Sequence, residues 1–220
     1  AAATMIIGVL GAATRYHVRR ILSFHIISQV GYMILGLGLF TPLALAGAVF
    51  YMLHHIIVKS NLFLISGLIQ RHGGSFELSR VGGLYRSHGW IALLFFIPAF
   101  SLAGFPPLSG FWAKMILIRA SLEVGQFVLA AVAAVVGLLT VYSMVKIWSE
   151  AFWKPRPEGI SERAGCVPPM NAWMLAPIMA MAAITVLIGL LPGPLYHMAR
   201  AAADELLEPG AYVYTVIGNM

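Results

Sequence analysis

The chain alternates long apolar runs with short polar turns over its 220 residues. A helix needs roughly 20 apolar residues to cross a hydrocarbon layer about 30 Å thick, and most of the runs reach that length. They predict a partial span at residues 1–14 and spans near residues 21–40, 43–69, 90–121, 126–152 and 171–191. The pattern therefore predicts an all-α polytopic membrane protein.

Composition excludes a soluble single-domain enzyme. Hydrophobic residues make up 60% of the chain and charged residues only 10%, whereas soluble domains carry about 25% charged residues. The formal net charge of +6 comes from short turns between apolar runs. We interpret it as a record of membrane orientation, and we expect no nucleic-acid partner.

Three basic turns are predicted to lie on one side of the membrane, because the intervening turns carry no basic excess and the C-terminal tail is acidic. Lys and Arg accumulate in cytoplasmic loops. We therefore place the basic turns in the cytoplasm and the C-terminus outside, in a multi-pass protein of the cell membrane. The turns contain Arg15, Arg19 and Arg20, then Arg71, Arg80 and Arg86, then Lys154, Arg156 and Arg163.

Three segments are expected: a transmembrane region at 1–152, a polar cytoplasmic linker at 153–170, and the last span with a short outer tail at 171–220. The linker holds Cys166, and a single cysteine excludes an internal disulfide or a cysteine metal cluster. The first residues read as the middle of an apolar helix with no basic n-region, so we expect the chain to begin inside a longer protein.

The span at 90–121 contains adjacent prolines, Pro106 and Pro107, followed by Gly110. Two prolines remove two amide donors and clash with the preceding turn, so we expect a broken helix with these residues at the hinge. Irregular backbone at membrane depth requires polar surroundings, which predicts that the break lines an internal wet path. A simple proline kink in a packing helix is the alternative.

Lys59 and Lys114 stand in apolar surroundings and are the leading candidates for a functional site. A lysine at the bilayer centre costs about 2.5 to 3.5 kcal/mol, so such residues usually face an interior polar path. Burial disfavours the charged form, which would let the amine release and regain a proton as a relay. The alternative is that either side chain snorkels its ammonium group to the interface.

Three histidines join these candidates. His55 precedes Lys59 by four residues and shares its helix face, whereas His54 lies about 100° around the helix. The neighbouring lysine favours a relay role for His55, and for His54 an interhelical hydrogen bond is an equal alternative. His25 is a weaker candidate for the same path. No acidic residue or cysteine lies near His54 and His55 in sequence, so we expect no metal site, and no cofactor motif is present.

Other polar residues have simpler interpretations. Ser28, Gln29 and Tyr32 recur at helical spacing with His25, and we interpret them mainly as interhelical hydrogen-bonding groups. Lys146 and Glu150 lie four residues apart near a helix end, which indicates a surface ion pair.

Three sequence blocks resemble the antiporter-like membrane subunits that Mrp cation/proton antiporters share with respiratory complex I. The blocks are Arg19–Met33, His54–Phe63 and Ala103–Lys114, and they occur in the family's order. Within that family, Met144–Trp153 and the acidic C-terminus look most like the D subunits of Mrp complexes. The resemblance covers essentially the whole chain.

The resemblance implies a protein of about fourteen helices built from two inverted five-helix repeats. This chain would supply the second repeat, with one broken helix, and the final transmembrane helix. Lys59 and its histidine neighbour would be central relay groups, and Lys114 the terminal proton-exchange residue. The first repeat, with its coupling glutamate and lysine, is absent from this sequence, and His17 stands where many relatives have an acidic residue.

The expected function is that of a membrane subunit in a multisubunit antiporter of Na⁺ or another monovalent cation, working with other subunits in the lipid bilayer and without covalent chemistry. One alternative is a proton-pumping membrane subunit of NADH-quinone oxidoreductase or a related hydrogenase complex. A second is a structural half-subunit that conducts nothing.

Overall fold

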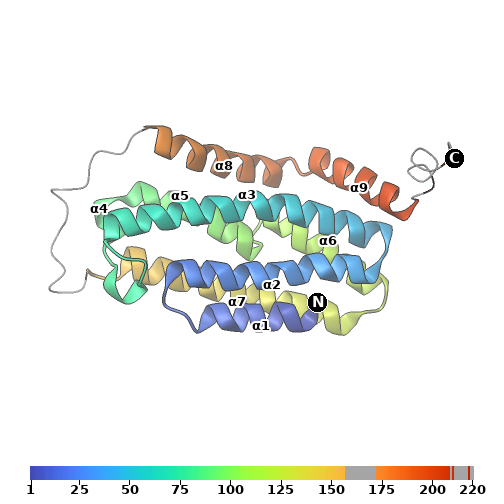
Figure 1. Cartoon of the computed structure of the whole chain (residues 1–220), viewed down its shortest axis with the longest axis horizontal. Coiled ribbons are helices and arrows are strands. Elements are labelled where there is room, and N and C mark those ends of the chain that lie inside the picture. The colour runs from blue at the N-terminus through green and yellow to red at the C-terminus, as the bar shows by residue number, and fades with distance from the viewer. Residues whose placement is uncertain (157–171, 209, 211–217, 219–220) are drawn as a thin grey trace.

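The computed structural model describes residues 1–156, 172–208, 210 and 218, and these residues are predominantly helical. The long helices run side by side along the long axis of the molecule (Figure 1). Among the described residues, four helices are long and apolar enough to cross a membrane. In chain order the elements are α1 (Ala2–Ala13), α2 (Val18–Leu39), α3 (Pro42–Gly73), the 3-10 helix η1 (Leu78–Arg80), α4 (Leu84–Ser87), α5 (Gly89–Ala103), α6 (Ser109–Glu123), α7 (Phe127–Trp148), the π-helix η2 (Ser149–Trp153), α8 (Ala172–Leu190) and α9 (Gly193–Leu207).

The longest helix, α3, has clear start and stop signals. The Thr41 side chain accepts a hydrogen bond from the Ala44 amide at 3.2 Å, and Pro42 occupies the first turn, where no amide donor is needed. The helix ends at Gly73, and the C-cap residue Gly74 has a φ of 84°, the left-handed conformation that glycine adopts without strain. It therefore extends four residues beyond the predicted span at 43–69.

The predicted span at 90–121 is two helices. The chain leaves the helical path between α5 and α6, over Gly104–Leu108, the segment that contains both prolines. Each helix has 15 residues and is about 22 Å long, which is too short to cross a hydrocarbon layer alone. The pair together crosses the bundle.

Helix α9 replaces the short tail expected after the last span. It continues from the end of α8 along one edge of the bundle (Figure 1), and Ala203 packs with Leu45 and Ala46 of α3. Its charged residues lower the mean hydropathy, so the segment is not recognised as an apolar run. Small residues four apart, Ala199 and Ala203, are the signal of its buried face.

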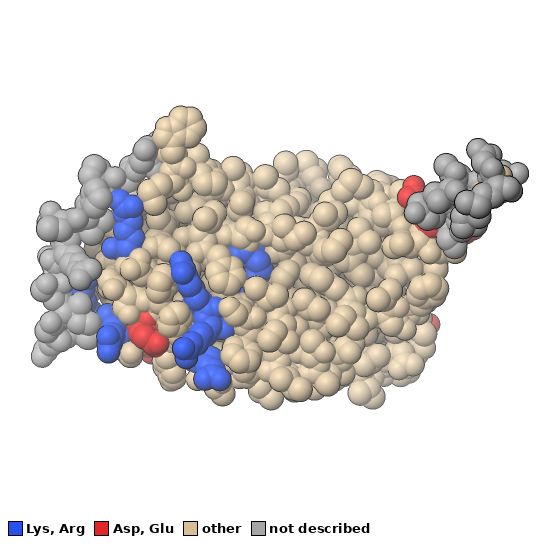
Figure 2. Space-filling view, in the orientation of Figure 1, with Lys and Arg blue, Asp and Glu red and all other residues tan. Residues whose placement is uncertain are grey.

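The two ends of the bundle differ in charge. Figure 2 shows Lys and Arg gathered near α4 and the start of α2 with a small acidic patch among them, and further acidic residues at the opposite end. The described basic turns thus lie together, as the charge pattern predicts. Most of the predicted linker, with Arg163 and Cys166, lies outside the described residues.

A buried polar layer separates two apolar clusters of the core. In α2, His25, Ser28 and Gln29 lie between Leu22 of one cluster and Tyr32 of the other. In α3, His54 and His55 lie between Tyr51 and Val58, which belong to the same two clusters. The α5–α6 break adds Ser101 and Ser109 to this layer. The polar groups are therefore concentrated at one depth inside an apolar bundle.

Candidate functional site

Lys114 occupies the gap that the two prolines leave at the end of α5. In a continuous helix, the carbonyls of Leu102 and Ala103 would accept from the amides four residues later, but Pro106 and Pro107 have no N–H. Lys114 Nζ donates to both carbonyl oxygens, at 2.9 Å each. An ammonium at a helix C-terminus also interacts favourably with the helix dipole.

Gly104 makes this arrangement sterically feasible. Its φ of 93° is in the left-handed region, and it ends α5 by donating its amide to the carbonyls of Phe100 and Ser101. A Cβ at this position would lie 2.8 Å from Lys114 Cδ. The absence of a side chain at Gly104 therefore leaves room for the lysine.

His54 ties α3 to the start of α6. Its Nδ1 lies 2.7 Å from Ser109 Oγ, which lies 3.0 Å from Ser101 Oγ. The Gly110 amide donates to Ser101 Oγ at 3.3 Å. Because His54 is only 1% exposed, these contacts form a closed polar cluster at the break. The helical spacing to Lys59 favoured His55 as a relay residue, but in the structure it is His54 that contacts the broken helix.

Lys59 lies further along α3, and it too bonds to backbone. Its Nζ donates to the Leu22 carbonyl of α2 at 3.0 Å, and the residue is 5% exposed. Within the described residues, the ion pairs are the surface pairs Arg119–Glu123, Lys154–Glu150 and Arg200–Asp204. Neither Lys59 nor Lys114 therefore has a carboxylate partner there.

His25 lies less than one helical turn after Leu22, next to the acceptor of Lys59. It is fully buried, and neither ring nitrogen has a hydrogen-bond partner among the described residues. His25 thus lies beside the contact between Lys59 and Leu22, although its sequence context made it the weakest candidate of the three histidines.

A pair of stacked tyrosines connects the polar layer to Lys114. The Tyr32 and Tyr51 rings are 5.1 Å apart, and Lys114 Nζ lies 5.3 Å from the Tyr32 ring centroid. Tyr51 donates its hydroxyl hydrogen to Gln29 Oε1 and meets the His54 ring edge-on at 5.8 Å. Tyr51 was not among the residues expected from the sequence, although its position three residues before His54 places both on one helix face.

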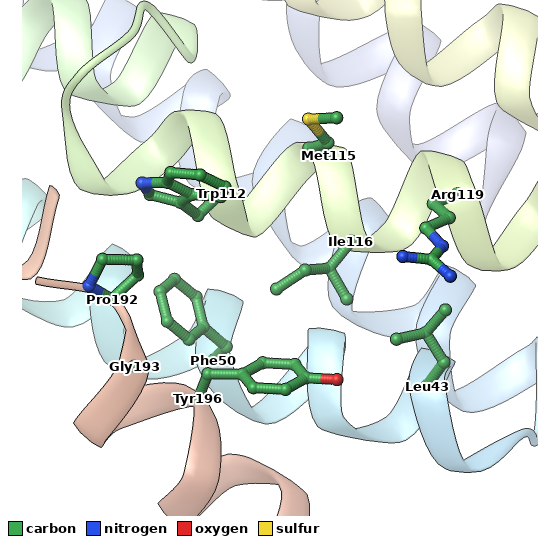
Figure 3. A pocket seen from close by; sticks show the side chains of 9 residues that line it. All are labelled: Leu43, Phe50, Trp112, Met115, Ile116, Arg119, Pro192, Gly193 and Tyr196. Atoms are coloured by element: carbon green, nitrogen blue, oxygen red, sulfur yellow. The ribbon is translucent and has the colours of Figure 1, made fainter.

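Cavities lie on both sides of α6. One of about 520 Å³, between the break, α6 and α7, is lined by Lys114 together with Gly104 and Gly137. The other, of about 340 Å³, lies between α3, α6 and α9 and is mainly apolar (Figure 3). Its lining cation, Arg119, is paired with Glu123 at 2.8 Å. Lys114 therefore has space beside it on the α7 side.

Lys146 does not form the expected ion pair. It donates to the carbonyls of Ala13 and Arg15, at 2.8 and 2.6 Å, while Glu150 pairs with Lys154 at 2.9 Å. The π-helix η2 begins just after Lys146 and contains Glu150. Lys146 is thus a peripheral lysine bonded to two carbonyls, like Lys114 but outside the polar layer.

A helical bundle with a broken helix and buried lysines is a multi-pass membrane architecture, and interrupted helices of this kind are found in many transporters. The family described as NADH:quinone oxidoreductase/Mrp antiporter, TM, matches residues 1–140. The chain belongs to this family.

Relatives and solved structures agree with this assignment. The chain is 46% identical to the D subunit of the Na(+)/H(+) antiporter of Alkalihalophilus pseudofirmus, over 97% of its own length and 43% of that protein. It is 34% identical to the N subunit of the NADH-quinone oxidoreductase of Desulforudis audaxviator, over 86% of this chain and 40% of that one. A chain in the structure of the Mrp complex from a Dietzia species matches with a TM-score of 0.86 and 37% identity, over 96% of this chain and 47% of that one. The chain spans less than half the length of these proteins.

Proposed function

We propose that this chain is part of a membrane subunit of a multisubunit Na⁺/H⁺ antiporter of the cell membrane, and that Lys59, Lys114 and the neighbouring histidines pass protons through it. In this proposal residues 1–152 form the second of two inverted repeats, and residues 171–220 follow it as the last membrane-crossing segment. The remaining half and the other subunits complete the transport path. The antiporter relatives favour a transporter subunit over an enzyme.

One observation carries the proposal: Lys114 is held by two carbonyl oxygens and by no carboxylate among the described residues. A buried carboxylate would stabilise the ammonium form and would be left as an unpaired charge on proton loss. Carbonyl oxygens are neutral, so a proton can leave without that penalty, and a neutral amine still has two N–H groups to donate. Such a lysine is suited to repeated loading and release of protons.

The other groups supply a route toward Lys114. His25, near the Leu22 carbonyl that accepts from Lys59, has two ring nitrogens, and a neutral imidazole can accept a proton on one and release it from the other. His54 and the serine pair at the break lie beside the same layer. In the proposed sequence, protons reach Lys59, pass through the histidine layer and leave from Lys114 through the cavity on the α7 side.

The proposal is tested by Na⁺-driven proton flux in inverted membrane vesicles that carry the full assembly. Lys59→Ala and Lys114→Ala should each abolish exchange at matched assembly, and Lys114→Arg should also fail because arginine does not release its proton. The matched control is Lys146→Ala, which removes a lysine with two carbonyl partners from outside the polar layer. Normal exchange in both Lys59→Ala and Lys114→Ala would instead identify this half as a structural scaffold.

The second candidate is a proton-pumping membrane subunit of NADH-quinone oxidoreductase or a related hydrogenase complex, favoured by the relative of 34% identity. The same lysines would then be driven by redox work elsewhere in the assembly. Genes for dehydrogenase subunits beside this one, together with proton flux that requires NADH or hydrogen and not Na⁺, would favour this candidate over the antiporter.

A further inference from the structure

A groove of about 490 Å³ opens at the basic end of the bundle, between α3, α8 and the start of α2. Its walls are apolar along most of their length, with Phe63 and Leu68 on α3 and Ile178 on α8. Arg19 and Arg71 line the same groove. The groove thus combines an apolar channel with two cations.

Arg19 is held in place by neutral groups. Its guanidinium carbon lies 4.1 Å from the Phe76 ring centroid, and its Nε lies 3.5 Å from Ser66 Oγ. The ion pairs of the described part of the chain join other residues, so Arg19 has no carboxylate partner there. Arg71 donates to Met174 Sδ at 3.4 Å across the groove. Arg19 therefore gives this surface a cation that is complementary to an anion.

The groove has room for a chain-like ligand beside α3. Gly67 lies on its wall, and a Cβ built at Gly67 meets no atom within 4 Å. Leu64 on the same wall is 41% exposed and Met174 on α8 is 45% exposed. A small free anion would leave these apolar surfaces uncovered, whereas a hydrocarbon chain matches them.

We propose that this groove binds an anionic phospholipid, with its phosphodiester against Arg19 and one acyl chain along Gly67 between α3 and α8. Basic pockets between transmembrane helices on the cytoplasmic side are suited to anionic headgroups, because the cations lie at headgroup depth and the apolar walls lie in the hydrocarbon layer. Here Arg19 lies in the first turn of α2 and Arg71 in the last turn of α3, and Figure 2 shows Lys and Arg gathered near the start of α2. The site is separate from the polar layer and does not depend on the direction of transport.

The test is photo-crosslinking of the full antiporter assembly in vesicles, with a phosphatidylglycerol that carries a diazirine on its acyl chain. We expect labelled peptides from α3 and α8 around Gly67 and Met174, and competition by unlabelled phosphatidylglycerol but not by phosphatidylcholine. Arg19→Gln should weaken binding about fivefold, the contribution of one cation near the surface. Gly67→Phe should abolish labelling by filling the groove.

Two matched controls separate the groove from general effects. Arg20→Gln removes a charge from the same turn, but Arg20 does not line the groove. Gly38→Phe adds the same side chain at another glycine with no atom within 4 Å. Both variants should be photo-labelled to the same extent as the unmodified protein.

Equal competition by phosphatidylcholine, displacement by inorganic phosphate alone, or full labelling of Gly67→Phe would each overturn the proposal. If Arg19→Gln does not assemble, Gly67→Phe decides the question, since a Cβ at this position meets no neighbouring atom.

Discussion

The replacement Gly110→Ala tests whether the polar cluster at the helix break needs close contact between α5 and α6. A Cβ at Gly110 would overlap the Ser101 carbonyl oxygen and would lie 2.8 Å from the Ser101 carbonyl carbon and 3.0 Å from His54 Nε2. Two of these atoms are backbone, so they cannot rotate away. The start of α6 would have to move, which stretches the contacts from His54 to Ser109 and from Gly110 to Ser101.

The magnitude follows from three contributions. Overpacking costs about 1 to 3 kcal/mol, and two weakened hydrogen bonds cost about 0.5 to 1.5 kcal/mol each. Because alanine has a higher helix propensity than glycine, up to about 1 kcal/mol of this cost is offset. The net destabilisation is therefore about 1 to 6 kcal/mol, with the displacement centred on the site itself.

The assay pairs thermal unfolding of the purified assembly with Na⁺-driven proton flux at matched assembly. Gly110→Ala should lower the unfolding temperature. It should also reduce the Na⁺-driven proton flux by a larger factor than it reduces the amount of assembled complex. Gly38→Ala is the matched control, because Gly38 is also helical and a Cβ there would meet no atom within 4 Å, so it should be neutral or slightly stabilising. Identical behaviour of the two variants would refute the close-contact reasoning.

Three further predictions concern single contacts. Trp112→Phe removes the indole hydrogen bond to the Gly189 carbonyl at 2.9 Å, and should cost about 0.5 to 1.5 kcal/mol and speed amide hydrogen exchange at the end of α8. Lys114→Met leaves two carbonyls at the break without a donor, at about 1 to 3 kcal/mol each, partly offset by removing a buried charge, so calorimetry should show a lower unfolding temperature. Thr41→Ala removes the cap on the Ala44 amide and should lower the free energy of unfolding by about 1 kcal/mol, measured by thermal unfolding. Na⁺-driven proton flux should be unchanged.

The helices and the burial of the lysines could be predicted from the sequence because both depend on local hydropathy. Long apolar runs around Lys59 and Lys114 require those residues to be inside the bundle or at its edge, and the structure buries both. Pro106 and Pro107 even specify which carbonyls lose their donors. The identity of the donor could not be predicted, since it depends on the direction in which α6 leaves the break.

The roles of the histidines show a different limit. Helical geometry separates His54 from His55 by about 100°, but it does not say which face meets the broken helix. The partner of His54 is Ser109, 55 residues away, so only the packing of α3 on α6 decides between the two. His55 keeps its place on the Lys59 face, and its part in proton transfer stays a prediction.

The end of α8 meets the α5–α6 break, and α6 provides the donors at both places. Gly189 lies so close to Pro107 and Leu108 that a Cβ there would lie 2.8 Å from Leu108 Cα, and its carbonyl, one residue before the helix ends, accepts from Trp112. Lys114, two residues further along α6, satisfies the carbonyls at the end of α5. Any shift of α6 therefore disturbs the ends of two helices at once, which ties the position of the proposed proton-exchange lysine to the packing of α8.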